Sequence, residues 1–394
     1  MNIKNIKKLI PILLVICLLS GCWDKVEIDR RSFVLTLGID AGEEISKVKD
    51  LKKLKPDEPF TDNNMKVLNI TYAFPDISQL SPEKGGVAED KSINVDAYSM
   101  EDAFSKATSR SSREISFGHS KLILFGTGLF AYPDVAKEVL DYLQRQPAVN
   151  RNTLVVIAEG KVEDYIKNKT LTEKNIQGYI SGLVENSDRN SSIIPLDLNE
   201  FLQNLSETGN AIMPLLSKEE GNKGLQLLGS GIIKNYEFKG TLSPTETSNV
   251  KMVRGKLKGG KKVIYKDGHP IDFEIDGMER KIKVTGEDNK LIFNIDINLE
   301  GEIKGYYLKE EIYSENVLEE IENNFNKALK EEMETTVKMI QGKYGVDVFG
   351  LSNYVQRYHP KVWNKIKDNW EEAFVNSVVK VDIKCHIRRI GVSK

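Results

Sequence analysis

Cys22 has the clearest chemical context of any residue in this sequence. It follows two small residues, Ser20 and Gly21, at the end of an apolar run that covers residues 9–19. A cysteine sulfur is a strong nucleophile, and small residues before it leave room for a peptidase at the preceding peptide bond. These residues are compatible with cleavage between Gly21 and Cys22, which would leave a nucleophilic sulfur at the new N-terminus.

The order Leu19, Ser20, Gly21, Cys22 resembles the lipobox of bacterial lipoproteins. The resemblance implies cleavage between Gly21 and Cys22 and attachment of lipid to the sulfur of Cys22. Alternative interpretations of Cys22 are a disulfide partner or a buried thiol without function. A disulfide is the weaker alternative, because removal of the leader would leave only Cys385 as a partner. A buried acyl methylene contributes about 0.8 kcal/mol, and two or more chains hold a protein stably at a bilayer.

The residues before Cys22 are organised as an export signal. Lys4, Lys7 and Lys8 precede the apolar run, and Ser20 and Gly21 follow it. A membrane-spanning helix needs about 20 apolar residues, and this run is shorter. We therefore predict that residues 1–21 are a lipoprotein signal peptide.

The remaining nucleophiles and bases form no catalytic pattern. The sequence has no Gly-x-Ser-x-Gly elbow, Walker loop, His-Glu-x-x-His or Cys-x-x-Cys. His119 and Ser120 are adjacent, and adjacent residues of a strand point to opposite faces, so they cannot act as a base and nucleophile pair. Cys385 lies on the apolar side of a predicted strand. The four histidines are not spaced as a ligand pair: His119, His269, His359 and His386. We expect no enzyme activity, no metal and no cofactor.

The overall charge excludes a strongly basic surface. Lysine and arginine together number 56, against 58 acidic residues, so neither nucleic acid nor anionic lipid is an expected partner of a polybasic face. One group of basic residues is either a docking patch or a set of ordinary solvated charges, and we favour the second interpretation: Arg110, Arg113, Lys121, Arg145 and Arg151.

The pattern of apolar residues predicts three domains after the signal peptide. In residues 22–215, predicted strands at 32–40, 66–74, 119–126 and 152–160 are interleaved with helices at 99–112, 133–144, 161–168, 173–184 and 198–205, which is typical of an α/β layer. Residues 216–277 are rich in glycine and lysine and predict a small middle domain of short strands. Within it, Ser243 and Glu246 form a capping-box sequence that opens a helix to Val253.

The C-terminal domain, residues 278–394, has the clearest periodicity. Residues 291–303 and 379–388 alternate between apolar and polar side chains, which is typical of an antiparallel sheet with one wet face. Between these strands an apolar stripe at helical spacing predicts one long helix that packs on the sheet or binds a partner: Val317, Ile321, Phe325, Leu329, Met333, Val337 and Ile340. Pro360 opens a second helix whose Trp363, Ile366, Trp370 and Phe374 share a face. The expected fold class is mixed α+β and α/β, with a C-terminal antiparallel sheet covered by two helices.

Several segments together resemble the Ger(x)C family of spore germination lipoproteins. They are GCWDKVEI and FVLTLGID near the start, then REISFGHSKLILFG, VLDYLQRQPAVNRNTLVVIAEG, DVFGLSNYVQRYHPKVWNKIKDNWEEAF and KVDIKCHIRRIG. The resemblance covers both ends and much of the N-terminal half. One departure is Ser352, where the family pattern leads us to expect glycine, and this puts the form of one turn in doubt.

The resemblance implies a three-domain protein without catalysis, the C subunit of a nutrient germinant receptor. Cys22 would be the lipid-bearing residue that anchors it to the outer face of the spore inner membrane, in complex with A and B receptor subunits. A solute-binding lipoprotein of an ABC-type importer is the main alternative, although that class needs two lobes of parallel βαβ units joined by a hinge. An anchored hydrolase and an extracytoplasmic scaffold are further alternatives.

Overall fold

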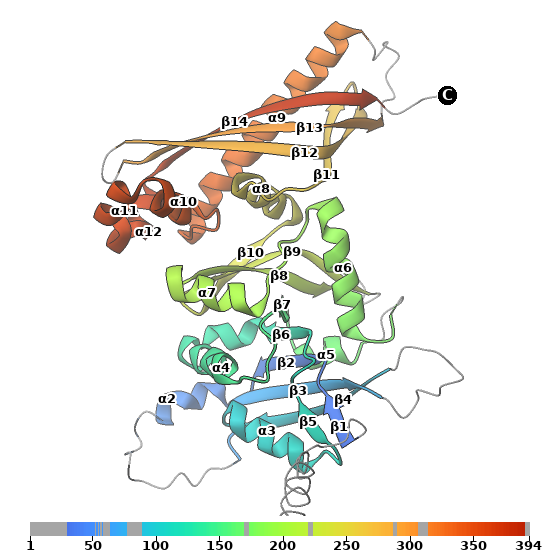
Figure 1. Cartoon of the computed structure of the whole chain (residues 1–394), viewed down its shortest axis with the longest axis vertical. Helices are drawn as coiled ribbons and strands as arrows, with labels where there is room; N and C mark the ends of the chain where they lie inside the picture. Colours follow the sequence, from blue (N-terminus) through green and yellow to red (C-terminus); the bar gives the residue numbers. More distant parts are fainter. Residues whose placement is uncertain are drawn as a thin grey trace, which may run out of the picture.

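The structure is a computed structural model that describes residues 30–51, 53, 55, 57, 64–76, 89–168, 173–219, 224–286, 290–305 and 314–390. Its described strands form an eight-stranded sheet, a four-stranded sheet and a two-stranded ladder. Figure 1 shows the two larger sheets one above the other along the long axis, with helix α8 between them. None of the described helices is both long enough and apolar enough to cross a membrane.

The large sheet has the strand order β10-β9-β8-β7-β6-β2-β3-β4. The strands β2, β6, β7 and β8 run parallel at its centre, and antiparallel strands complete both sides. The bounds are β2 Thr36–Ala41, β3 Leu68–Pro75, β4 Asp90–Ala97, β6 Leu122–Gly126, β7 Leu154–Ala158, β8 Asn210–Lys218, β9 Leu225–Lys234 and β10 Glu237–Leu242. Beside it, β1 (Arg31–Phe33) pairs in parallel with β5 (Glu114–Ser116).

Helices cover both faces of the large sheet. On one face lie α3 (Met100–Ser109), α4 (Pro133–Arg145) and α7 (Leu198–Thr208), and on the other lie α5 (Val162–Ile166) and α6 (Ile176–Asn190). The sequence of α4 explains why this segment forms a helix with one face against the sheet. Pro133 occupies its first turn, and its buried residues recur at spacings of one, three and four. Short helical turns at Ile45–Lys47, Val48–Leu51 (α2) and Thr127–Ala131 follow β2 and β6.

The C-terminal sheet has the order β11-β12-β13-β14. Its strands are β11 Gly260–Lys266, β12 His269–Thr285, β13 Ile292–Gly305 and β14 Val378–Ile390. The first three strands are antiparallel, as the alternating pattern predicted. In one detail the structure differs from the prediction, because β14 runs parallel to β13. The helices between these two strands return the chain to the same end of the sheet, and alternation alone does not encode strand direction.

The long C-terminal helix is confirmed as α9, Glu315–Met339. Its apolar stripe packs on the helix's own sheet, where the rings of Phe325 and Phe273 lie 5.2 Å apart. On the edge strand β14, the backbone N–H of Cys385 donates to Asn326 Oδ1 at 2.7 Å, and that of Ile387 donates to Glu322 Oε1 at 2.7 Å. The helix therefore both covers the core and occupies hydrogen-bonding groups of an exposed sheet edge.

The helix predicted from Pro360 is divided in the structure. It consists of α11 (Pro360–Ile366), a 3₁₀ turn at Lys367–Asn369 and α12 (Trp370–Val375), and α10 (Leu351–Tyr358) precedes it. Trp370, Phe374 and Ile366 still share the buried side, so the apolar face was predicted correctly although the break was not. A break at the 3₁₀ turn leaves no signal in the spacing of apolar residues.

The segment predicted as a small middle domain, residues 216–277, contributes to both large sheets. Its described part forms no sheet of its own, because β9 and β10 extend the N-terminal sheet, whereas β11 and the first half of β12 belong to the C-terminal sheet. Between them lies α8 (Pro244–Arg254), whose predicted capping box is present at Ser243 and Glu246. Alternation within a strand does not reveal which sheet the strand joins.

Candidate functional site

The predicted lipid site lies outside the described residues. Cys22 and the cleavage position between Gly21 and Cys22 precede Arg30, the first described residue. Both therefore remain predictions that rest on the sequence.

The histidines and the remaining cysteine occupy structural or exposed positions. The ring of His119 packs edge-on against Phe33 at 4.5 Å, while the hydroxyl of Ser120 is buried 3.2 Å from that of Thr153. The side chain of Cys385 is 1% exposed, and burial raises the pKa of its thiol to about 12. This cysteine is therefore protonated and unsuited to nucleophilic chemistry. Among the described residues, no group of three or more His, Cys, Asp or Glu side chains is placed to hold a metal ion.

A cleft lies at the carboxyl ends of the parallel strands. The chain leaves β6 toward α4 on one face of the sheet and leaves the adjacent β7 toward α5 on the other. In open α/β sheets such a divergence creates a crevice at which ligands commonly bind. The structure has a cavity of about 550 Å³ there. It is lined by Asp40, Ala41, Gly42, Glu43, Asn69, Asp96, Thr127, Gly128, Gly160, Lys161 and Glu163.

Asp40 is the most perturbed ionisable group of this cleft. It is the penultimate residue of the apolar strand β2, is only 8% exposed, and accepts a hydrogen bond from the backbone N–H of Val162 at 2.7 Å. Burial raises the pKa of the Asp40 carboxyl to about 6, although hydrogen bonds from the N–H groups of Val162 and Glu163 oppose the shift. A Cβ atom at Gly126 would lie 1.9 Å from Asp40 Oδ1, so only glycine fits beside this carboxylate.

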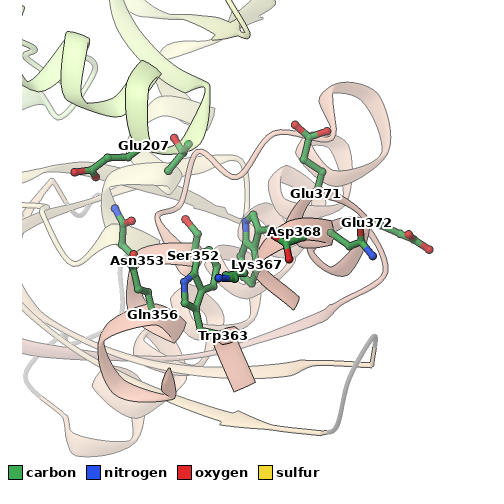
Figure 2. Close-up of a pocket in the computed structure, with 12 residues that line it drawn as sticks. Glu207, Ser352, Asn353, Gln356, Trp363, Lys367, Asp368, Glu371 and Glu372 are labelled. Atoms are coloured by element: carbon green, nitrogen blue, oxygen red, sulfur yellow. The ribbon is translucent and has the colours of Figure 1, made fainter. Parts of the chain in front are cut away.

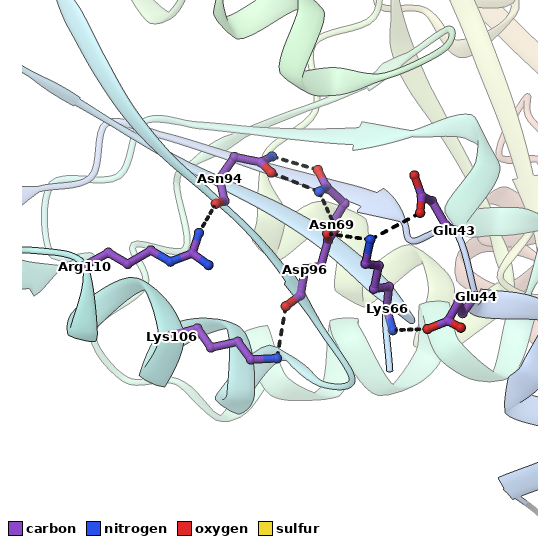
Figure 3. Close-up of polar contacts among 8 residues, drawn as sticks. All are labelled: Glu43, Glu44, Lys66, Asn69, Asn94, Asp96, Lys106 and Arg110. Carbon is purple, nitrogen blue, oxygen red and sulfur yellow. Dashed lines mark hydrogen bonds and ion pairs between the residues drawn. The ribbon is translucent and has the colours of Figure 1, made fainter. Parts of the chain in front are cut away.

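A hydrogen-bonded network of amides and charges forms one wall of the cleft (Figure 3). Asn69 and Asn94 exchange hydrogen bonds between β3 and β4 at 2.8 and 3.0 Å, and Asn69 also donates to Asp96 at 2.7 Å. Lys66 bridges Glu43 at 3.3 Å and Asp96 at 3.7 Å. These bonds orient the wall before any ligand binds, which makes the cleft a preorganised polar surface.

Neither the role of Asp40 nor this network was predicted from the sequence. The available signal was a carboxylate directly after an apolar strand, in LTLGID, but the partners of Asp40 come from residues 126 and 162–163. The basic group that was predicted as solvated charges has local partners. Arg145 pairs with Asp141 at 2.9 Å, Arg110 donates to the carbonyl of Asn94 at 3.0 Å, and Arg151 donates to a carbonyl of α4.

Comparisons with known proteins identify the family. The family described as "Spore germination protein N-terminal domain" matches residues 24–218, and "Spore germination B3/ GerAC like, C-terminal" matches residues 228–391. "Spore germination protein B3" of Bacillus subtilis (strain 168) is 27% identical over 98% of this chain and 99% of that protein. "Spore germination protein YndF" of the same organism is 25% identical over 99% of both chains.

A solved structure supports the same assignment. The structure entitled "Crystal Structure of the GerBC protein" superposes with a TM-score of 0.58 at 25% identity, and the match covers 82% of this chain and 93% of that one. The predicted mixed α/β class is thereby confirmed. The N-terminal match ends with β8, and the C-terminal match runs from β9 through the C-terminal sheet. Together they show that this chain belongs to the Ger(x)C family of spore germination proteins, the homologues of germinant receptor C subunits.

Proposed function

We propose that this protein is a lipid-anchored subunit of a spore nutrient germinant receptor and that it acts by association, without catalysis. The observation that carries the proposal is the lipobox at Cys22, placed directly before a chain whose two halves both match the germination family. Its partners would be the A and B receptor subunits, and its location the outer face of the spore inner membrane.

The position of Cys22 limits how the body can sit relative to the membrane. Arg30, the first described residue, precedes β1 at the end of the molecule formed by the N-terminal sheet (Figure 1). A fully extended chain spans about 3.3–3.6 Å per residue, so an anchor at Cys22 would keep Arg30 within about 29 Å of the bilayer surface. The tether would thus hold the start of the N-terminal sheet near the bilayer, and lateral confinement would raise the effective concentration of the protein near membrane partners.

Mass spectrometry of the native protein tests the tether. We expect the first peptide to begin at Cys22 and to carry a diacylglyceryl group. An unmodified N-terminal peptide that still contains Met1 and the apolar leader would overturn the proposal.

Genetic replacement tests whether the lipid matters for germination. Cys22→Ala should weaken the germinant response and membrane retention. Cys385→Ala is the matched control, because it removes a buried thiol that carries no lipid. A Cys22→Ala protein that remains membrane-bound and supports a normal response would contradict the role of the tether.

Affinity purification from detergent-solubilised spore membranes tests the assembly. Co-purification of A and B receptor subunits is the expected result. Recovery of two ATP-driven permease subunits instead would favour the importer alternative.

A further inference from the structure

A pocket of about 770 Å³ lies where the N-terminal sheet's helix α7 meets the helices that precede β14. Figure 2 shows Glu207 on the α7 side of the pocket, facing Ser352 and Asn353 of α10, with Trp363 beneath them. The volume is within the range of about 300–1,000 Å³ that is typical of small-molecule sites. The lining residues are Glu207, Thr208, Ser352, Asn353, Gln356, Trp363, Lys367, Asp368, Asn369, Trp370, Glu371 and Glu372.

Direct contacts between the two halves of the molecule hold the walls of this pocket together. Lys234 of β9 pairs with Glu371 at 2.7 Å and donates to the carbonyl of Gly345 at 3.3 Å. The hydroxyl of Tyr344 donates to the carbonyl of Thr241 at 2.9 Å. A ligand would therefore meet a largely preformed site, which lowers the entropic cost of binding.

Two tryptophans give the pocket an aromatic surface with one unused donor. The ring centroids of Trp363 and Trp370 lie 5.5 Å apart at an angle of 55°. Trp370 is only 8% exposed, and its indole N–H is buried with no hydrogen-bond acceptor among the described residues. Buried tryptophan N–H groups usually have a partner, because leaving one unpaired is unfavourable. An acceptor atom of a ligand that reached this N–H would satisfy it.

The charges around the pocket favour a cation. Four carboxylates line it, from Glu207, Asp368, Glu371 and Glu372, against one ammonium group from Lys367. Of these carboxylates, Glu371 is already paired with Lys234. Glu207 accepts a hydrogen bond from Gln203 at 2.9 Å, which leaves Asp368 and Glu372 on the exposed rim of the pocket. The same pocket is lined by two indole rings, and indoles are the aromatic groups that attract cations most strongly.

We propose that this pocket binds a small organic cation, an ammonium or guanidinium compound that also carries a hydrogen-bond acceptor such as a carbonyl. The positive group lies near the carboxylates and the indole faces, and the acceptor receives the N–H of Trp370. The concave shape favours a small molecule over a segment of a partner protein. The site is separate from Cys22, so it exists whether or not the chain is lipidated.

Intrinsic fluorescence reports directly on this pocket. The chain has three tryptophans, and Trp23→Phe would leave only Trp363 and Trp370, which both line the pocket. The probe is Nα-acetyl-arginine amide, titrated into the full-length Trp23→Phe protein in mild detergent. Nα-acetyl-citrulline amide is its neutral counterpart of nearly the same shape.

We expect a saturable fluorescence change with the arginine compound and at least about tenfold weaker binding of the citrulline compound. Equal binding of both compounds, or no binding of either, would overturn the proposal. Response to an arginine-rich peptide but not to the single amide would identify a protein-docking site and would likewise overturn it.

Substitutions locate the binding event. The double change Asp368→Asn and Glu372→Gln, both on the exposed rim, should weaken the arginine compound about tenfold. Trp370→Phe keeps a ring but removes the N–H, and we expect binding about fivefold weaker. Glu138→Gln, an exposed carboxylate on α4, is the control and should change nothing. Circular dichroism verifies that each variant is folded, and full affinity in the folded rim variant would refute the assignment.

Discussion

Replacing Asp40 by asparagine should change how stability depends on pH. The carboxyl of Asp40 is buried at the end of β2, and burial raises its pKa from 3.8 to about 6. Between these two values the unfolded chain has lost the proton while the folded protein retains it. The folded state binds more protons in this window, so the contribution of Asp40 makes the free energy of unfolding fall as pH rises from about 4 to about 6.

The size of this effect follows from the two pKa values. A difference of one pH unit corresponds to about 1.4 kcal/mol, so the contribution of Asp40 declines by up to about 3 kcal/mol between pH 3.8 and 6. An asparagine at this position can still accept the hydrogen bond from Val162 but does not titrate. The free energy of unfolding of the wild type minus that of Asp40→Asn should therefore decrease by up to about 3 kcal/mol as pH rises from 3.8 to 6.

Urea unfolding followed by circular dichroism at pH 4, 5, 6 and 7 measures the difference. Asp90, whose pKa burial also raises to about 6, is present in both proteins and cancels. Asp267→Asn is the matched control, because this exposed turn residue has a φ of 50° that asparagine also adopts. If the free energy of unfolding of the wild type minus that of Asp40→Asn stays constant or increases with pH, the reasoning is refuted. Such a result would mean that the hydrogen bonds from the N–H groups of Val162 and Glu163 lower the pKa of Asp40 by at least as much as burial raises it.

Two further predictions concern packing and processing. Gly301→Ala would place a Cβ atom 2.0 Å from the carbonyl oxygen of Glu274 and should lower the free energy of unfolding by about 1–3 kcal/mol. Gly277→Ala is the control, because its Cβ atom would meet no atom within 4 Å, and it should change the free energy of unfolding by less than about 0.5 kcal/mol in the same urea titration. Equal losses in the two variants would contradict this account. With a thiol reagent at pH 8, Cys385 should not react in the folded protein because burial raises its pKa to about 12, and the mature protein in urea should titrate one thiol. A count of all three cysteines of the sequence would instead show that Cys22 is unmodified and the leader retained.

Regular periodicity made much of the fold predictable from sequence. The stripe from Val317 to Ile340 predicted α9, and the alternation in residues 291–303 predicted β13, because in each case one buried face repeats over many residues. Local chemistry was equally informative at Ser243, where the capping box begins α8. Such signals depend only on neighbours in the sequence.

Irregular strands were harder to predict. Pro214 argues against a central strand because proline lacks an N–H, yet β8 lies between β7 and β9, and a shift in register follows Pro214. Gly277 was taken as the end of a domain, whereas β12 continues through it with another register shift. In both strands the irregularity accommodates the residue that would otherwise end the strand.

The two candidate sites could not be predicted because their residues are distant in the sequence. The cleft joins Asp40 to the turns after β6 and β7. The pocket between α7 and the helices that precede β14, here called the junction pocket, joins Glu207 to residues 352–372. Trp363 and Trp370 were predicted on one face of a single helix, whereas they lie in α11 and α12. The break at Lys367–Asn369 and the approach of α7 are tertiary features. No spacing rule within one segment encodes them.

The way in which the two sheets meet bears on the importer alternative. A solute-binding protein closes around its ligand by rotating two lobes about a hinge, which requires an interface that can separate. Here α8 connects the sheets: Thr247 hydrogen-bonds Ser230 of β9 at 3.2 Å, and Asn249 donates to Thr336 of α9 at 2.9 Å. One continuous apolar core includes residues of the large sheet, such as Ile212 and Ile232, of α8 and of the C-terminal sheet.

Separating the two sheets would expose this shared core to water at about 25 cal/mol for each Å² of apolar surface. Domains of one chain move freely only when their interface is small or polar. The described body is therefore built to stay together as one unit, which agrees with a subunit that acts through stable association. A ligand in the junction pocket would bind to walls that are already in contact, so small-angle scattering of the full-length protein with and without the arginine compound should give the same radius of gyration. A contraction on binding would instead reveal a hinge and revive the importer interpretation.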